Sequence, residues 1–315
     1  MNPDTIQLHD PSTGATASIL AGFGFNCYSF RAPRGGKLHE VLWSAPGFES
    51  GGGRASGSGI PLLFPFPGRI AGGRYDFEGR SWQLEPGDGR GNAIHGFVLD
   101  RPWQVVERSA THAVGRFQAS AVEPNLLDHW PSDFTLTVTY TLDGSSLRAQ
   151  FDVHNPGPGR LPFGLGAHPY FRLPVDEAEN FAQCRVTVPV SGAWELVDLL
   201  PTGKPLSGEA PSRLSTGVDF GQTAFDDVFT GLNRRGGTAT ASIHDPMSGR
   251  TISVHFDEAF RECVVYNPPH REAICIEPYT CVPDPFRLTA AGIDAGLRIL
   301  DPGQSFRASM EIRLD

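Results

Sequence analysis

The chain has 315 residues, of which 26 are lysine or arginine and 35 are aspartate or glutamate, and its formal net charge is −9 at pH 7. Because phosphate groups are recognised mainly by lysine and arginine, this balance disfavours nucleic acid or an anionic membrane as the main partner. The length suffices for a large core, and all-β folds often exceed the roughly 150 residues of an average domain, so residues 1–315 are predicted to form a single domain.

Turn-forming residues are spread along the chain, with 37 glycines and 27 prolines and no linker-like tract dividing it. The only low-complexity stretch, residues 51–59, is rich in glycine and serine and is followed by Ile60-Pro61. A phosphate-binding loop would end in Gly-Lys-Ser/Thr and continue into a helix, and this stretch does neither. We interpret it as a mobile surface loop; the less favoured alternative is that it covers a binding cleft.

Two polar residues then interrupt apolar surroundings. Arg69 follows residues 64–68, which are rich in proline and phenylalanine, and His95 lies between Ile94 and Gly96. The simpler interpretations are an arginine at a strand end with its charge in water and a structural or surface histidine. Membership of a binding site is the alternative for both, and neither signal decides alone.

Strict alternation predicts a β-hairpin in the middle of the chain. Residues 135–142 alternate threonine with apolar side chains, Asp143-Gly144 turns the chain, and residues 147–153 repeat the period of two after a loop longer than two residues. The same period recurs at residues 186–190, 252–256 and 310–314. Helical periodicity is hard to find, so the predicted fold is all-β, a large antiparallel β-sandwich.

Three further titratable residues lie between these segments. His168 precedes Pro169 among apolar and aromatic residues, where a core histidine with satisfied hydrogen bonds is the plain alternative. Asp226 and Asp227 are adjacent, and on an extended segment they point to opposite faces, so at most one of them enters a given cleft. A turn or a solvated strand edge is the simpler interpretation of this acidic pair.

An acidic residue ends a late apolar run. Glu277 follows Ile274-Cys275-Ile276 and is fixed by Pro278, so the segment is predicted to be a buried strand. An ionised carboxylate is costly to bury without a partner, which leaves a salt bridge or an acid–base role for Glu277. With His168 in the same cleft it would form a proton-transfer pair. An apolar strand end raises a glutamate's pKa, and an adjacent carboxylate favours a protonated histidine.

The cysteines indicate the compartment. Their number is odd and their spacing wide, so we expect buried free thiols and a reducing environment. A zinc site is not expected, because the one close pair has no second pair beside it. The N-terminus lacks a basic region followed by an apolar run, and no window approaches about 20 apolar residues, so a cytoplasmic location is predicted. The five are Cys27, Cys184, Cys263, Cys275 and Cys281.

Taken together in chain order, these segments resemble the aldose 1-epimerases, or mutarotases, from about residue 20 to the C-terminus. Each motif is weak alone, and the ordered set is specific. The matching segments are Pro67-Gly68-Arg69-Ile70, Ile94-His95-Gly96, Ala167-His168-Pro169-Tyr170-Phe171, Phe225-Asp226-Asp227-Val228-Phe229, Ile276-Glu277-Pro278-Tyr279-Thr280 with Pro283-Asp284, and Leu300-Asp301-Pro302-Gly303-Gln304.

The resemblance implies a β-sandwich with a cleft that binds a free sugar, without a metal or organic cofactor. It implies that Glu277 takes the proton of the anomeric hydroxyl while His168 protonates the ring oxygen, so that the ring opens and recloses on the other face. Arg69, His95 and one of Asp226 and Asp227, with Asp226 favoured, would hold the sugar hydroxyls. Aromatic faces would come from among Trp43, Phe66, Tyr170, Phe171 and Tyr279.

The sequence departs from the usual epimerase pattern in two places that leave alternatives open. Gly68 stands where many epimerases have asparagine, and Pro169 follows the second histidine. Residues 59–61 and 95–97 look closer to the hexose-6-phosphate epimerase branch, although the arginine expected shortly afterwards is delayed to Arg101. A phosphate would need several basic groups, from among Arg69, Arg74 and Arg101. A non-catalytic carbohydrate-binding protein and, less favoured, a glycoside hydrolase with two carboxylates remain as further alternatives.

Overall fold

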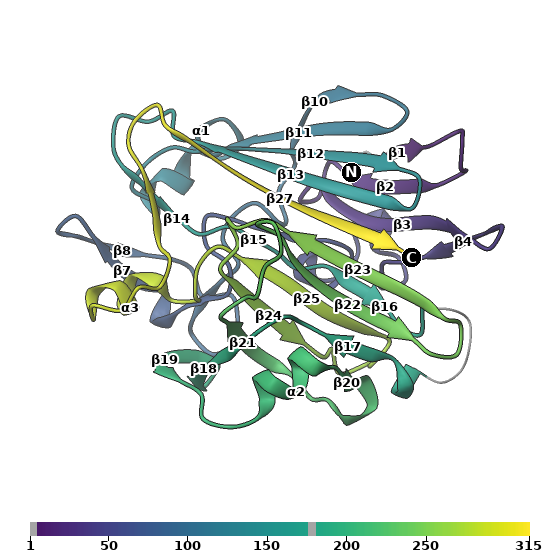
Figure 1. Cartoon of the computed structure of the whole chain (residues 1–315). Helices are drawn as coiled ribbons and strands as arrows, with labels where there is room; N and C mark the ends of the chain where they lie inside the picture. Colours follow the sequence, from purple (N-terminus) through teal and green to yellow (C-terminus); the bar gives the residue numbers. More distant parts are fainter. Residues whose placement is uncertain (1–4, 176–180) are drawn as a thin grey trace.

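The computed structural model describes residues 5–175 and 181–315, and two large antiparallel sheets dominate it (Figure 1). The first has nine strands, in the spatial order β10 (Gln104–Arg108), β11 (His112–Gln118), β12 (Thr135–Asp143), β13 (Ser146–His154), β27 (Ser305–Leu314), β23 (Arg250–Phe256), β22 (Ala239–Asp245), β17 (Arg185–Thr187) and β20 (Val218–Asp219). The second runs β19 (Leu200–Pro205), β18 (Gly192–Val197), β21 (Asp226–Thr230), β24 (Glu262–Tyr266), β25 (Ala273–Tyr279), β15 (Gly166–Ala167) and β5 (Leu62–Leu63), with β16 (Tyr170–Arg172) also paired to β25.

Smaller elements surround these sheets. A four-stranded sheet is formed by β1 (Thr5–His9), β2 (Thr16–Leu20), β3 (Asn26–Arg34) and β4 (Lys37–Glu40). The two-stranded pairs are β6 (Arg69–Ile70) with β9 (Ala93–Ile94), β7 (Arg74–Phe77) with β8 (Arg80–Gln83), and β14 (Leu161–Phe163) with β26 (Arg298–Leu300). The α-helices are α1 (Ala119–Val122), α2 (Ala210–Thr216) and α3 (Pro285–Ala290). Short 3₁₀ turns are η1 (Phe48–Ser50), η2 (Ala55–Gly57), η3 (Ala71–Gly73), η4 (Pro124–Asp128), η5 (Phe181–Gln183) and η6 (Phe220–Gln222).

This architecture confirms the predicted all-β class, with strands at 135–143, 146–154, 250–256 and 305–314. The loop of the predicted hairpin is shorter than expected, because Asp143 pairs with Ser146 and leaves a two-residue turn. Gly144 at φ +55° supplies the left-handed conformation that this turn needs. None of the helices in the described ranges has the length and apolar character to cross a bilayer.

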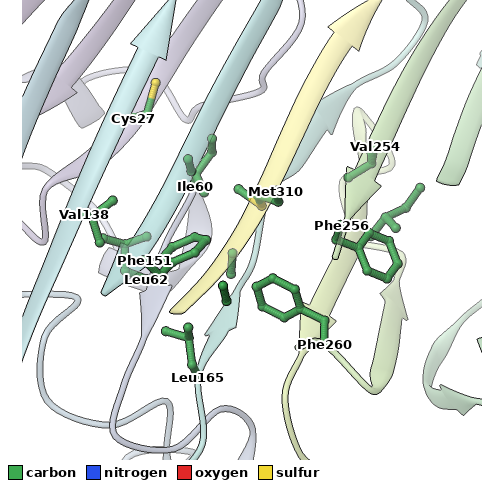
Figure 2. Packing of buried hydrophobic residues seen from close by; sticks show 14 of the residues in the cluster. Cys27, Ile60, Leu62, Val138, Phe151, Leu165, Val254, Phe256, Phe260 and Met310 are labelled. Atoms are coloured by element: carbon green, nitrogen blue, oxygen red, sulfur yellow. The ribbon is translucent and has the colours of Figure 1, made fainter. Parts of the chain in front are cut away.

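The main core lies where side chains of the two large sheets meet (Figure 2). Val138 and Met310 reach it from β12 and β27, while Leu62 reaches it from β5 of the other sheet. Phe151 and Phe260 meet edge to face, with their ring centroids 6.1 Å apart. Fully burying such a side chain contributes about 1.5–3 kcal/mol, so this shared core is what holds β25 and its neighbours in place. The five cysteines are buried and free, as predicted.

Strand β25 is buried on both faces, and the faces differ in character. Ile274 and Ile276 belong to the main core. Cys275, Glu277 and Tyr279 alternate with them and therefore point to the opposite face of the sheet. The predicted buried strand is confirmed, and its period of two explains how an acidic side chain can end an apolar run without entering the core.

A second buried acid, Glu262 on β24, leads to a stability prediction. It is 2% exposed, and Trp194 Nε1 donates to its Oε2 at 3.0 Å. Burial raises the pKa of Glu262 to about 7 from 4.5. A raised folded-state pKa stabilises the protein fully below about pH 4.5, and that stabilisation is lost as the pH rises through 7. The free energy of unfolding of Glu262→Gln, relative to wild type, should therefore rise between pH 4.5 and 8.5 by on the order of 2–3 kcal/mol.

Urea denaturation of both proteins at the two pH values measures this difference. Glu209→Gln, at an exposed position before α2, is the matched control and should show no such change. A pH-independent difference between Glu262→Gln and wild type would show that the carboxyl group titrates normally in the folded protein.

Candidate functional site

A cleft opens on the face of the eight-stranded sheet that carries Glu277. Three adjacent strands supply its floor, because Asp226 on β21 is opposite Tyr266 on β24, and Val264 on β24 is opposite Glu277 on β25. His168 reaches the cleft from the connection between β15 and β16, and the short β6–β9 pair brings Arg69 and His95 to its edge. Five of the six candidate residues therefore line one cleft; Asp227 is not among its lining residues.

Glu277 is the most deeply buried acid in the cleft, at 1% exposure. Tyr279, two residues along the same strand face, donates its hydroxyl to Glu277 Oε2 at 2.6 Å. Burial raises the pKa of Glu277 well above its usual value, and the negative charge of Asp226 adds to this, while the Tyr279 hydrogen bond and the Arg69 charge oppose it. The carboxyl group therefore keeps its proton to a higher pH than an exposed glutamate does.

His168 is the ion-pair neighbour of Glu277. Its Nε2 lies 3.3 Å from Glu277 Oε1, and its ring stacks on Tyr170 with centroids 4.8 Å apart and an interplanar angle of 4°. Burial lowers the pKa of His168 to about 3, so desolvation outweighs the neighbouring carboxylate, contrary to the expectation from sequence. His168 Nδ1 is buried and has no hydrogen-bond partner in the described part of the chain. No acceptor at Nδ1 therefore stabilises a protonated His168 ring.

Arg69 is oriented by Asp88, a residue that the sequence did not single out. Arg69 Nε donates to Asp88 Oδ2 at 3.2 Å, and the Asp88 side chain is 1% exposed. Asp88 Oδ1 also accepts from the backbone N–H groups of Arg90 and Asn92. Although burial opposes it, hydrogen bonds from Asn92 and Arg90 lower the pKa of Asp88, so the carboxylate stays charged and fixes the guanidinium.

Two glycines allow the backbone to approach closely around His95. Gly96 at φ +76° lies so close to Phe64 that a Cβ would come within 2.0 Å of its carbonyl oxygen. Gly68 at φ +67° is left-handed, and a Cβ there would come within 2.6 Å of the Pro283 side chain, so an asparagine at this position would require Pro283 to shift. The Gly68 N–H donates to His95 Nδ1 at 3.3 Å, which leaves the proton of a neutral ring on Nε2.

The charge state of His95 follows from its surroundings. The residue is 8% exposed, and burial, together with the nearby His168, Arg69 and Arg54, lowers its pKa well below the usual value. A neutral imidazole with its proton on Nε2 offers one hydrogen-bond donor, which suits a neutral hydroxyl group.

Of the acidic pair, Asp226 lies at the cleft and Asp227 does not. Their alternation along β21 explains the difference, because adjacent side chains on a strand point to opposite faces. Burial raises the pKa of Asp226, and the positive charges of Arg69 and Arg90 work against this rise. Asp226 and His95 both line the cleft, and the Asp226 carboxyl group is near enough to Arg69 to feel its charge.

Part of the glycine-rich stretch lies at the cleft, in line with the less favoured interpretation, although residues 52–54 are exposed at the surface. Ser56 is buried, its carbonyl accepts from the Tyr170 hydroxyl at 2.9 Å, and Arg54 lines the cleft. Nothing in the described chain forms a hydrogen bond or ion pair with the Arg54 guanidinium. Of the expected aromatic faces, Tyr170 and Tyr279 line the cleft, while Phe171 belongs to the core.

The basic groups considered for a sugar phosphate do not converge. Arg101 Nε pairs with Glu123 at 2.7 Å, and its Nη1 donates to Phe97 O at 2.8 Å and to Asp100 at 3.0 Å. Arg74 is exposed on β7 and does not line the cleft. The phosphate-specific alternative is therefore not favoured.

One group of side chains combines metal-ligand atoms in the described chain. His168, Cys275 and Glu277 bring a ring nitrogen, a thiol sulfur and a carboxylate oxygen within 4.8 Å of one another. Burial raises the pKa of the Cys275 thiol well above its usual value, with the Glu277 charge adding to the effect, whereas metal ligation uses the thiolate. The donor set is therefore a poor match to a metal, and the His168 ring nitrogen and the Glu277 carboxylate already lie 3.3 Å from each other.

Comparisons with known proteins identify the family of the chain. The chain is 26% identical over 289 residues to the uncharacterized protein YphB of Escherichia coli K12, covering 86% of this chain and 88% of the relative. It is 28% identical over 200 residues to human galactose mutarotase, covering 59% of this chain and 56% of the human protein. The sequence also matches the family model for aldose 1-epimerase.

Solved structures share the fold. A galactose mutarotase-like protein from Clostridium acetobutylicum superposes with a TM-score of 0.85 at 21% identity, covering 100% of this chain and 99% of the other. Galactose 1-epimerase from Lactobacillus acidophilus gives a TM-score of 0.73 at 15% identity, with 99% of both chains covered. Because the family model spans residues 4–313, the chain belongs to the aldose 1-epimerase family and is an isomerase of that class.

Proposed function

We propose that this protein interconverts the α and β anomers of a free aldose by acid–base-catalysed ring opening, with Glu277 and His168 as the catalytic pair. The observation that carries the proposal is their 3.3 Å contact inside a buried cleft edged by polar groups suited to hydroxyls. The anomeric hydroxyl oxygen and the ring oxygen are both bonded to C1. An acid and a base that touch each other can therefore reach both oxygens at once.

The reaction then has three steps. Glu277 removes the proton of the C1 hydroxyl while His168 gives a proton to the ring oxygen, so the C1–O5 bond breaks and C1 becomes an aldehyde. Rotation about C1–C2 presents the other face of the carbonyl. The O5 hydroxyl attacks C1, His168 recovers its proton from O5, and Glu277 returns a proton to the carbonyl oxygen. No net proton is gained or lost.

The pair carries one proton between its members in the active form. Burial favours the neutral arrangement, with the proton on Glu277 and an uncharged His168, because it raises the pKa of Glu277 and lowers that of His168. Transfer across the 3.3 Å contact produces the carboxylate and the imidazolium that the reaction uses. Sugar hydroxyls brought beside the pair supply polar groups that favour this charged arrangement.

Positioning is assigned to the groups at the edge of the cleft. Arg69 and the Nε2–H of His95 donate to hydroxyls, and Asp226 accepts from one. Asp88 acts through Arg69 as a positioning residue, since it fixes the guanidinium by its 3.2 Å contact. Tyr279 holds Glu277 in the same way, through its 2.6 Å hydrogen bond.

Polarimetry of freshly dissolved α-glucose and α-galactose tests the proposal directly. We expect the wild-type protein to accelerate the approach to anomeric equilibrium for at least one of them, in proportion to enzyme concentration, beyond the spontaneous rate in buffer. Heat-denatured protein at the same concentration is the control. A rate equal to the buffer blank with every free aldose tried would contradict the proposed function.

A further inference from the structure

A second cavity opens directly beside the catalytic cleft. It lies between η4, residues 84–87 and residues 96–101, and it shares Arg54, Ser56, Ile94 and His95 with the cleft. None of Glu277, His168 and Asp226 lines it. The cavity is therefore a continuation of the sugar site on the far side of His95 from the catalytic pair.

The walls of the second cavity combine apolar surface with hydrogen-bonding groups. Leu84, Phe97 and Leu126 are each less than a tenth exposed and give it an apolar lining. Glu85 and Asn125 are exposed and line it without a side-chain hydrogen bond to any other described residue. Apolar walls with a few polar groups at the edge are what a neutral, hydroxyl-rich ring requires.

The charges around the cavity do not favour a phosphate. The Arg101 guanidinium is already bonded to Glu123, Asp100 and the Phe97 carbonyl. The cavity thus retains one unpaired cation, Arg54, and one unpaired anion, Glu85, among its described lining residues. A dianionic group placed there would be repelled by the carboxylates of Glu85, Asp100 and Glu123 and attracted only by Arg54. The hydroxyls of an uncharged sugar ring can accept hydrogen bonds from the cation and donate them to the carboxylates.

The position of the cavity indicates which end of the sugar faces it, and this step rests on the proposed function. With Glu277 at the C1 hydroxyl and His168 at the ring oxygen, the next ring atom beyond that oxygen is C5, which carries C6. The His95 ring lies beside the His168 ring, with centroids 5.7 Å apart, and it separates the cleft from the cavity. The exit toward the cavity is therefore on the C6 side of the bound sugar.

We propose that the second cavity is a subsite for another sugar ring, linked to C6 of the aldose in the catalytic cleft. The substrate class then includes 1→6-linked disaccharides, whose reducing-end ring is epimerised while the second ring occupies the cavity. Arg54, at the junction, donates to the glycosidic region or to hydroxyls of both rings. Glu85 and Asn125 contact the second ring.

Matched pairs of glucose disaccharides test this subsite. Isomaltose and maltose differ only in a 1→6 or 1→4 link, and so do gentiobiose and cellobiose with the other anomeric configuration. Exchange NMR between the α and β anomeric protons at equilibrium gives enzyme-dependent rates for each without the need for a pure anomer. Two well-made hydrogen bonds in the subsite correspond to roughly tenfold higher kcat/KM. We expect such a gain over glucose for a 1→6-linked sugar and none for its 1→4-linked counterpart.

Two variants on the same 3₁₀ turn locate the effect. Asn125→Trp places a bulky ring in the cavity and should bring the ratio of disaccharide to glucose kcat/KM below one. Asp128→Trp, at an exposed position of η4 that does not line the cavity, should keep the wild-type ratio. Using a ratio within each protein removes any general loss of active enzyme.

The outcomes separate this inference from the proposed function. If no free aldose is accelerated, the proposed function fails. If glucose is accelerated while 1→6-linked and 1→4-linked sugars behave alike, the subsite inference is overturned and the function stands. A preference for glucose 6-phosphate over every 1→6-linked disaccharide would also overturn it, since the cavity would then hold an anion.

Discussion

Glu277→Gln should lower kcat for anomer exchange by about 10²–10⁴-fold, the range typical of removing a positioned general base. The amide keeps the size of the carboxyl group and can still accept the Tyr279 hydrogen bond that is 2.6 Å long in the wild type. It cannot take a proton from the anomeric hydroxyl. KM should change little, because the groups assigned to hydroxyl binding are Arg69, His95 and Asp226. Exchange NMR at saturating sugar measures the effect.

The chain offers a close control for this substitution. Glu262 is also a buried glutamate, lies on the neighbouring strand β24 opposite Tyr279, and does not line the cleft. Glu262→Gln should keep wild-type kcat, so a general effect of removing a buried carboxyl from this sheet is separated from catalysis. Full activity of Glu277→Gln would assign the base to another group, and Asp226 would then be the next carboxylate to test.

The hairpin at residues 135–154 illustrates what local pattern can predict. Alternating side chains fixed both strands, since a half-buried strand must present one face to the core. The turn was predicted too long, because the ladder continues to Asp143 and Ser146 although neither is apolar. At residues 186–190 the apolar period is present, yet β17 ends at Thr187, and the Val188 N–H donates to the carbonyl oxygen of Leu214 in α2 instead. Burial alone does not determine which backbone groups pair.

In the candidate site too, contacts within one strand could be predicted from the sequence, and contacts between separate segments could not. Tyr279 as a partner of Glu277 was within reach of sequence reasoning, because residues two apart on a strand share a face. Asp88 was not, since it lies 19 residues from Arg69 and its contact depends on how two short strands pair. A signal was nonetheless present: an aspartate in the turn-forming residues 88–92, just before Ile94-His95-Gly96, is typical of a structured loop.

The charge state of His168 could not be predicted from the sequence, and the expected protonated ring was wrong. From sequence, a nearby carboxylate favours the charged imidazole. In the fold, burial of the His168 ring, which stacks on Tyr170, lowers its pKa instead. The size of a desolvation effect depends on how closely other side chains surround the ring. That packing is a property of the assembled sandwich and not of any local segment.

His168→Gln is expected to lower kcat by about 10²–10³-fold and to change the pH profile of the reaction. In the wild type, activity requires one proton on the pair. Activity falls at low pH because the pair takes up a second proton, and the lowered pKa of His168 places this fall well below neutral pH. Activity falls at high pH because the pair loses its one proton above the raised pKa of Glu277. The two apparent pKa values of this profile belong to the coupled pair and not to either residue alone.

In His168→Gln only the carboxyl of Glu277 titrates, so the residual reaction uses the carboxylate as a base without an acid partner. Its rate should rise with pH to a plateau, and the alkaline fall of the wild type should disappear. His270→Asn is the matched control, because His270 also stacks on an aromatic ring, that of Trp43 at 4.1 Å, but does not line the cleft. It should retain the wild-type profile. A bell-shaped profile that survives in His168→Gln would show that the proton for the ring oxygen comes from elsewhere, with the neighbouring His95 as the group to replace next.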